Sequence, residues 1–259
     1  MRSFTLHRLV HLRDLLRVLV ARDMKLRYKR SVLGVAWSLL NPLAHLGVFY
    51  FVFGVVLPLN IPNYAMYLLT GVLAWSWFQS SLLAATNSLV DSRDLIQLPN
   101  FPPAVLPVVT VSSHLLHFLL AFPIFLGLIM SGGGRLSSAL LLLPIVIAVQ
   151  FVITLGFAYV VASIHVTLRD TQYLLGLILQ LMFFLTPVFY EASAIPSRFQ
   201  WLYRLNPMVA MIEAYRAILI QGAVPDMVVM GRLGLGAVLV LAVGYKIFVR
   251  TRYRFVEEI

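Results

Sequence analysis

The feature that most restricts the fold is a run of sixty residues, from Ser31 to Val90, without a single Asp, Glu, Lys or Arg. About twenty apolar residues suffice to cross the hydrocarbon core of a bilayer, so this run is long enough for two crossings. It is interrupted at 58–63, where two Pro and two Asn residues favour a turn. The sequence therefore predicts transmembrane helices at about 32–57 and 64–90.

Further apolar runs, each bounded by charged, Gly-rich or Pro-containing segments, predict four more spans. They lie at about 104–130, 137–165, 171–190 and 228–249. The chain is 61% hydrophobic and only 12% charged, a composition typical of membrane proteins. We expect residues 1–259 to form one all-α transmembrane domain with six spans.

Residues 8–30 precede the first span and combine a leucine face with many basic residues. The apolar face recurs at helical spacing at Leu9, Leu12, Leu16, Leu19 and Val20. This pattern favours an amphipathic helix that lies in the membrane interface. A helix packed on a soluble partner is the alternative.

The segment 191–226, before the last span, is too charged and too interrupted to cross the membrane. Asn206 is suited to cap a helix and Pro207 to begin it, which predicts a helix over Met208–Ile220 that ends before Gly222. We expect short re-entrant helices here, dipping into the outer leaflet.

The positive charge is distributed unevenly along the chain. Of its 20 Lys and Arg residues, fifteen fall on one side of the predicted topology and five on the other. Basic residues accumulate on the cytoplasmic side of membrane proteins, so both termini are predicted to be cytoplasmic. The net charge of +10 is thereby explained by topology rather than by nucleic-acid binding.

Motifs for several kinds of chemistry are missing from the sequence. There is no cysteine, no G-x-x-x-x-G-K-[ST] and no H-E-x-x-H. His114 and His117 are interpreted as a packed or outward-facing pair rather than a metal site. Every carboxylate falls at or outside a predicted membrane edge, whereas ion-coupled transporters generally bury one. A transporter of this kind needs an external energy source.

Several stretches resemble the membrane subunits of type-2 ABC exporters for polysaccharides, such as O-antigen, capsule and teichoic acids. The resemblance covers nearly the whole chain and rests on Arg22–Leu43 (RDMKLRYKRSVLGVAWSLLNPL), Pro99–Pro102 (PNFP), Leu168–Asp170 (LRD), Thr186–Tyr190 (TPVFY), Asn206-Pro207 and Glu213–Arg216 (EAYR).

This resemblance implies a homodimer in the cytoplasmic (inner) membrane, paired with two copies of a cytoplasmic ABC ATPase. ATP and Mg would bind in that partner, and this chain would hold no cofactor or metal. Its cargo would be a lipid-linked polysaccharide. A type-2 ABC permease for a smaller lipid or drug remains an alternative. A membrane enzyme acting on lipid-linked sugars is another, but it would need clustered carboxylates, and Glu191, Glu213 and Asp226 are scattered in the sequence.

Two predicted cytoplasmic segments are candidates for contact with the ATPase. The first is short, stiffened by proline and carries charges of both signs, and the second is the turn after the fourth span. Their candidate contact residues are Asp91, Arg93, Asp94, Leu95, Pro99, Phe101 and Pro102, with Arg169 and Asp170. Ordinary loops between spans are the alternative.

Arg27, Lys29 and Arg30 stand where the amphipathic helix meets the first span. Clustered cations at this level could bind the pyrophosphate head group of a lipid-linked substrate. Anchoring by the phosphates of ordinary lipids is the alternative.

Aromatic side chains within the spans are candidates to line a sugar path, because sugars present apolar C–H faces to aromatic rings. The candidates are Trp37, Tyr50, Phe53, Tyr67, Trp75 and Phe78. Lipid-facing or interfacial positions are the alternative for each.

Glu213 and Arg216 are spaced to meet on one helix face. We expect them to neutralise each other where a short helix enters the outer leaflet, and a gating role at the exit is the alternative.

Overall fold

The computed structural model describes residues 2–29, 34–131 and 137–258. Within these ranges the chain is helical and contains no strand. The α-helices are α1 (Arg2–Tyr28), α2 (Trp37–Tyr50), α3 (Tyr64–Asn87), α4 (Arg93–Ile96), α5 (Val105–Leu120), α6 (Phe122–Ser131), α7 (Leu143–Thr167), α8 (Thr171–Leu185), α9 (Gln200–Leu205), α10 (Pro207–Leu219) and α11 (Met227–Glu258). A π-helix, η2 (Phe51–Val56), continues α2, and 3-10 turns lie at Gly34–Ala36, Val90–Ser92, Ser138–Leu142, Ala192–Ala194 and Ser197–Phe199.

Four helical segments are long and apolar enough to cross a membrane. They are Tyr64–Asn87, Val105–Gly127, Ser138–Thr167 and Met227–Tyr253. The predicted spans at 32–57 and 171–190 correspond to shorter apolar helices, Leu40–Val56 and Thr171–Leu185. The latter, at 1.5 Å per residue, is about 22 Å long, less than the roughly 30 Å of a hydrocarbon core. The coarse prediction of an all-helical membrane protein is confirmed.

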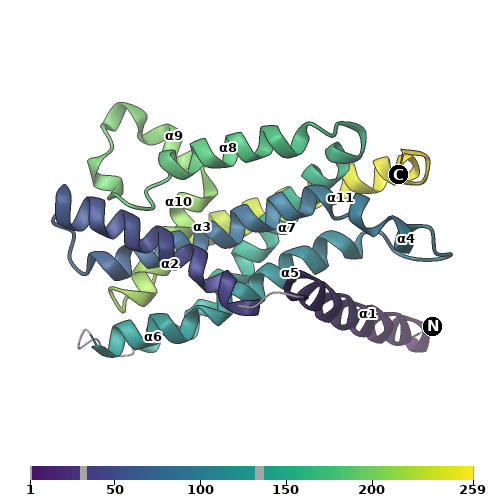
Figure 1. Cartoon of the computed structure of the whole chain (residues 1–259), viewed down its shortest axis with the longest axis horizontal. Coiled ribbons are helices and arrows are strands. Elements are labelled where there is room, and N and C mark those ends of the chain that lie inside the picture. Colours follow the sequence, from purple (N-terminus) through teal and green to yellow (C-terminus); the bar gives the residue numbers. More distant parts are fainter. Residues whose placement is uncertain (1, 30–33, 132–136, 259) are drawn as a thin grey trace.

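The long helices run lengthwise through the molecule, and both termini lie at the same end of it (Figure 1). We call this the terminal end. The short helix α4 and the turn between α7 and α8 lie at the same end, while the α2–α3 turn and α9 lie at the opposite end (Figure 1). Six crossings with both termini in the cytoplasm stay a prediction.

Helices α7 and α11 pack closely along their length, because small residues face each other. A Cβ on Gly156 would lie 2.7 Å from the backbone nitrogen of Leu241, and a Cβ on Gly244 would collide with the carbonyl oxygen of Gly156. Ala158 and Ala162 are fully buried along α7. Such close backbone approach is the usual way in which membrane helices associate.

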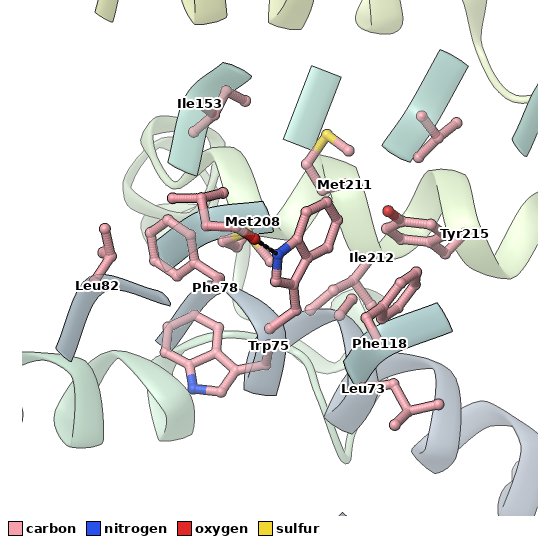
Figure 2. Packing of buried hydrophobic residues seen from close by; sticks show 14 of the residues in the cluster. Leu73, Trp75, Phe78, Leu82, Phe118, Ile153, Met208, Met211, Ile212 and Tyr215 are labelled. Atoms are coloured by element: carbon pink, nitrogen blue, oxygen red, sulfur yellow. Dashed lines mark hydrogen bonds between the residues drawn. The ribbon is translucent and has the colours of Figure 1, made fainter. Parts of the chain in front are cut away.

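Helix α3 forms the centre of the core, with fifteen buried residues among its 24. Its Trp75 and Phe78 pack in one cluster with Met208, Met211 and Ile212 from α10 (Figure 2). Figure 2 also shows Phe118 and Tyr215 close together in this cluster, and their ring centroids are 5.7 Å apart. The core therefore includes α10, a helix that the sequence placed in a re-entrant segment outside the spans.

Helix α10 begins as the sequence predicts. The Asn206 side chain accepts a hydrogen bond from the backbone N–H of Met208 at 3.0 Å, and Pro207 is the first helical residue. The helix ends at Leu219, and Gly222 has a φ of +63°, a conformation that glycine adopts without strain. Whether this segment re-enters a membrane stays a prediction.

The predicted amphipathic helix is present as α1, and part of its leucine face packs within the chain. Leu12, Leu15, Leu16, Leu19 and Val20 pack against Leu95 and Phe101 of the α4 region and Val105 and Val109 of α5. This part of the face is therefore packed within the chain, because α5 and the α4 region offer an apolar surface. Whether α1 lies in the membrane interface stays a prediction.

Candidate functional site

The first predicted ATPase contact forms a compact protrusion at the terminal end. After α3, the chain makes the turn Val90–Ser92, the single-turn helix α4 and a Pro-containing connection to α5. Leu95 and Phe101 pack against α1, and Ile96 is buried in the core. The charged members and Pro99 are exposed, and Pro102 is half-buried. An apolar base with exposed charges of both signs suits a surface that transmits force from a partner.

The second predicted contact lies beside the first. Arg169 and Asp170 are exposed in the turn between α7 and α8. The amide of Asn87 at the end of α3 donates to the side-chain oxygen of Gln172 at 3.2 Å, joining the two connections. His165 is buried between them, and the charges of Asp91 and Arg169 both act on its ring. The structure therefore brings the two segments together.

Among the three predicted head-group cations, Arg27 has the most defined surroundings. Its Nε donates to Asp23 at 3.1 Å, and its Nη1 lies 2.9 Å from Nε2 of His114 on α5. Because arginine has donors only, His114 must accept, which assigns its ring proton to Nδ1. Lys29 is exposed, and Arg30 lies outside the described residues.

Arg27 also lines a cavity of about 280 Å³ between α1, α2, α3 and α5. We call this cavity the Arg27 pocket. Its lining is Arg27, Trp37, Asn41, Pro42, Leu73, Ser76, Trp77, Ser80, His114, His117 and Phe118. His114 and His117 meet edge to face, with centroids 5.6 Å apart. No group of three or more His, Cys, Asp or Glu residues suited to a metal occurs in the described part of the chain.

The six candidate aromatics fall into three kinds of position. Trp37 and Tyr50 are 53% and 45% exposed, and Trp37 lines the Arg27 pocket. Phe53 and Tyr67 are half-buried, and Phe53 stacks on Phe189 at 5.1 Å.

The other two candidates, Trp75 and Phe78, are only 1% and 5% exposed, in the core (Figure 2). Packing within the chain occupies their rings, since Trp75 lies against Phe183 and Phe78 against Phe157. The structure therefore gives these two no free surface for a sugar, contrary to our expectation.

Arg216 has a different partner from the one that its spacing suggests. Its side chain is buried, at 5% exposure, and lies over the ring of Tyr67 at 3.4 Å. Its Nη1 donates to the Tyr67 hydroxyl at 2.7 Å and to the Pro187 carbonyl at 2.8 Å, and its Nη2 to the Val188 carbonyl at 2.7 Å. The predicted ion pair with Glu213 is therefore wrong, although the charge of Glu213 still acts on the guanidinium.

The reason is the turn that follows α8. Thr186 and Pro187 end this helix and leave carbonyl groups without helical partners, and buried carbonyls need donors. Arg216 supplies them, while the hydroxyls of Tyr64 and Tyr67 donate to the carbonyls of Phe189 and Tyr190 at 2.9 and 2.8 Å.

Asn206 completes this arrangement by donating to the Thr186 hydroxyl at 2.8 Å. We call the group formed by Tyr64, Tyr67, Thr186–Tyr190, Asn206 and Arg216 the Arg216 cluster. Three of the stretches that carry the resemblance, Thr186–Tyr190, Asn206-Pro207 and Glu213–Arg216, thus meet around one guanidinium.

Gly71 on α3 is required by the same cluster. A Cβ at this position would lie 2.9 Å from Nη2 of Arg216 and 2.9 Å from the Val188 carbonyl oxygen. Sequence reasoning missed Gly71, Tyr64 and the contact between Arg27 and His114. The i, i+3 spacing of Tyr64 and Tyr67 was a usable signal, but nothing in the sequence indicated what faced them.

A family model described as ABC-2 type transporter matches residues 14–220, most of the chain and all three of these stretches. The chain belongs to this family. The resemblance identified from the sequence is therefore confirmed, and the chain is a transport subunit rather than an enzyme.

Relatives named as export permeases or transport proteins align with this chain over 90% or more of its length. It is 37% identical to the O-antigen export system permease protein RfbA of Myxococcus xanthus, over 95% of this chain and 96% of that protein. It is 33% identical to the RfbA permease of Klebsiella pneumoniae, over 97% of both chains. It is 26% identical to the polysialic acid transport protein KpsM of Escherichia coli, over 90% and 92%.

Proposed function

We propose that this chain is the membrane-channel half of an ATP-driven exporter that moves a lipid-linked polysaccharide, of the O-antigen or capsule type, across the cytoplasmic membrane. The observation that carries the proposal is the similarity to the Myxococcus xanthus O-antigen export permease over 95% of the chain. The family match and the lack of a nucleotide-binding motif in the sequence support a subunit driven by a separate ATPase.

In this proposal the chain forms a homodimer with two ATPase subunits, and ATP and Mg bind in those partners. Six spans cross the membrane, with the shorter helices at Leu40–Val56 and Thr171–Leu185 completing the set and both termini in the cytoplasm. The position of both termini at one end of the molecule supports this topology (Figure 1). Residues 191–226 form the re-entrant outer segment.

The protrusion at the terminal end is proposed as the ATPase contact. Its exposed Asp91, Arg93 and Asp94 would meet the partner, and Leu95 and Phe101 would pass its motion to α1. Arg169 and Asp170 would form a second, adjoining contact. Trp37, Tyr50, Phe53 and Tyr67 remain proposed lining residues of the sugar path.

A strain that lacks this chain and its ATPase tests the function directly. Restoring both should return polymer to the cell surface, while restoring either alone should leave polymer in the cytoplasm. Co-purification of the ATPase with the chain provides the second measurement. Export without any ATPase, or a strain whose surface polymer is unchanged when the chain is deleted, contradicts the proposal.

Variants of the protrusion sharpen this test. Asp94→Ala together with Arg93→Ala should reduce co-purification of the ATPase and export, because both side chains are exposed and contribute little to folding. The matched control is Arg198→Ala, an exposed cation just before α9, the helix that lies at the opposite end of the molecule (Figure 1). It should leave both measurements unchanged.

A further inference from the structure

The Arg27 pocket has the chemistry of an anion site. It is lined by the guanidinium of Arg27, two imidazoles, two serine hydroxyls, the Asn41 amide and the Trp37 indole, and none of the described residues that line it carries a carboxylate. The neighbouring cavity across Arg27 is different, since the carboxylates of Asp23 and Asp91 line it. An anion is therefore favoured in the first cavity and disfavoured in the second.

Two hydrogen bonds orient the guanidinium of Arg27 but occupy only part of its N–H donors. It donates through Nε to Asp23 and through one N–H of Nη1 to His114. Its three other N–H groups make no hydrogen bond within the described residues. His114 is buried, at 7% exposure, and its hydrogen bond with Nη1 helps to orient the guanidinium. Spare donors in a fixed plane are suited to phosphate oxygens, which arginine binds in a bidentate manner.

The two serines give an independent indication. Ser76 and Ser80 lie one helical turn apart on α3, and both line the pocket. In the described part of the chain neither hydroxyl has a hydrogen-bond partner. Hydroxyls in membrane helices commonly donate to the carbonyl four residues earlier, as Thr70 does to Met66 at 2.8 Å. Both serines are therefore available to a ligand.

The pocket lies alongside the middle of two candidate spans rather than at their ends. His114 is about 14 Å along α5 from Val105, at 1.5 Å per residue, and Ser76 is at the middle of α3. An ionisable group at such a depth is costly and indicates a functional site. A cavity of about 280 Å³ holds several water-sized groups, which is enough for a diphosphate.

We propose that the Arg27 pocket binds the diphosphate of a lipid-linked substrate part-way through its passage. This inference rests on the proposed function and deepens it, because it adds Ser76, Ser80, His114 and His117 to the cation named from the sequence. Arg27 and the serines would contact phosphate oxygens, while His114 would position Arg27. Lys29, which is exposed, would contribute only general attraction.

The test measures binding to the purified full-length chain in nanodiscs of neutral lipid, by calorimetric titration. The probes are inorganic pyrophosphate, a short-chain polyprenyl diphosphate and phosphatidylglycerol. Arg27→Gln should weaken diphosphate binding by about tenfold to a hundredfold, the effect of losing charge-assisted hydrogen bonds. The double variant Ser76→Ala with Ser80→Ala should weaken it several-fold. The matched control Lys29→Gln, which removes the same charge, should stay within about twofold.

The outcomes separate the possible ligands. Tighter binding of the polyprenyl diphosphate than of pyrophosphate, with the same dependence on Arg27, identifies a lipid head group. Tighter binding of pyrophosphate identifies a free diphosphate instead and overturns the head-group assignment. Equal losses in Arg27→Gln and Lys29→Gln, or equal binding of phosphatidylglycerol, overturn the pocket.

Export of polymer by the same variants separates the pocket from the function. A wild-type chain that binds the diphosphate lipid but exports no polymer contradicts the proposed function and leaves the pocket standing. If Arg27→Gln exports polymer and binds the lipid like the wild type, the pocket alone is overturned.

Discussion

Two arginines of this chain sit among aromatic rings or imidazoles, and their surroundings differ in one decisive respect. Arg216 uses four of its five N–H groups on Tyr67 and on the carbonyls of Pro187 and Val188, and only its Nε is without a partner. Arg27 uses two and faces a cavity. A buried arginine whose donors are occupied by backbone carbonyls elsewhere in the chain stabilises the fold. An arginine with spare donors beside a cavity is available to a ligand.

The largest expected effect on stability comes from replacing Arg216, whose donors are occupied by the chain. Arg216→Met leaves the carbonyls of Pro187 and Val188 buried without donors, which should lower the free energy of unfolding by about 3–5 kcal/mol. Thermal unfolding in detergent measures it. Arg216→Lys is the control and should recover little, because one ammonium cannot replace the planar fork. Wild-type stability for Arg216→Met would mean that the cluster is not structural.

A smaller effect is expected from filling the space beside that cation. Gly71→Val would place side-chain atoms against Nη2 of Arg216 and the Val188 carbonyl, and should destabilise the chain by about 1–3 kcal/mol. The control is Gly231→Val on α11, where a Cβ meets nothing within 4 Å. Equal unfolding temperatures for the two variants would contradict the close contact.

Removing a single hydroxyl should have a still smaller effect. Tyr67→Phe keeps the ring under Arg216 but loses the hydroxyl that donates to Tyr190 and accepts from Nη1. We expect a loss of about 1–2 kcal/mol in the free energy of unfolding. Tyr50→Phe, at an exposed ring, provides the reference and should change it by less than about 0.5 kcal/mol. An equal loss of unfolding free energy in Tyr50→Phe would contradict a specific role for the Tyr67 hydroxyl.

The smallest effect on stability is expected at the other arginine. Arg27→Gln should change the free energy of unfolding by less than about 1 kcal/mol, since its pair with Asp23 is partly exposed. Polymer export should nevertheless fall several-fold. A variant that unfolds as readily as Arg216→Met would show that Arg27 too is structural, and the contrast between the two regions would disappear.

The sequence was sufficient to predict features that depend on local chemistry. The four long apolar helices, the capping of α10 by Asn206 and the turn before α3 follow from hydropathy, from a side-chain acceptor and from proline. Spacing on one helix was misleading for Glu213 and Arg216. Arg216 instead donates to the backbone carbonyls of a turn about thirty residues earlier in the chain.

Long-range packing decided contacts that hydropathy did not predict. The leucine face of α1 packs in part against α5, and Trp75 and Phe78, which the sequence suggested as channel aromatics, pack in the core. The pairing of Arg27 with His114 joins residues 87 positions apart. Hydropathy ranks a residue as apolar or polar, but it does not say which other helix will reach it.

The close contact between Gly156 of α7 and Gly244 of α11 has a consequence for measuring helix movements during transport. With Gly156 and Gly244 in direct backbone contact, the two helices cannot separate without stripping this contact. The two helices should therefore move together. A fluorophore or spin label placed near Arg250, on α11, would report the tilt of α7 as well.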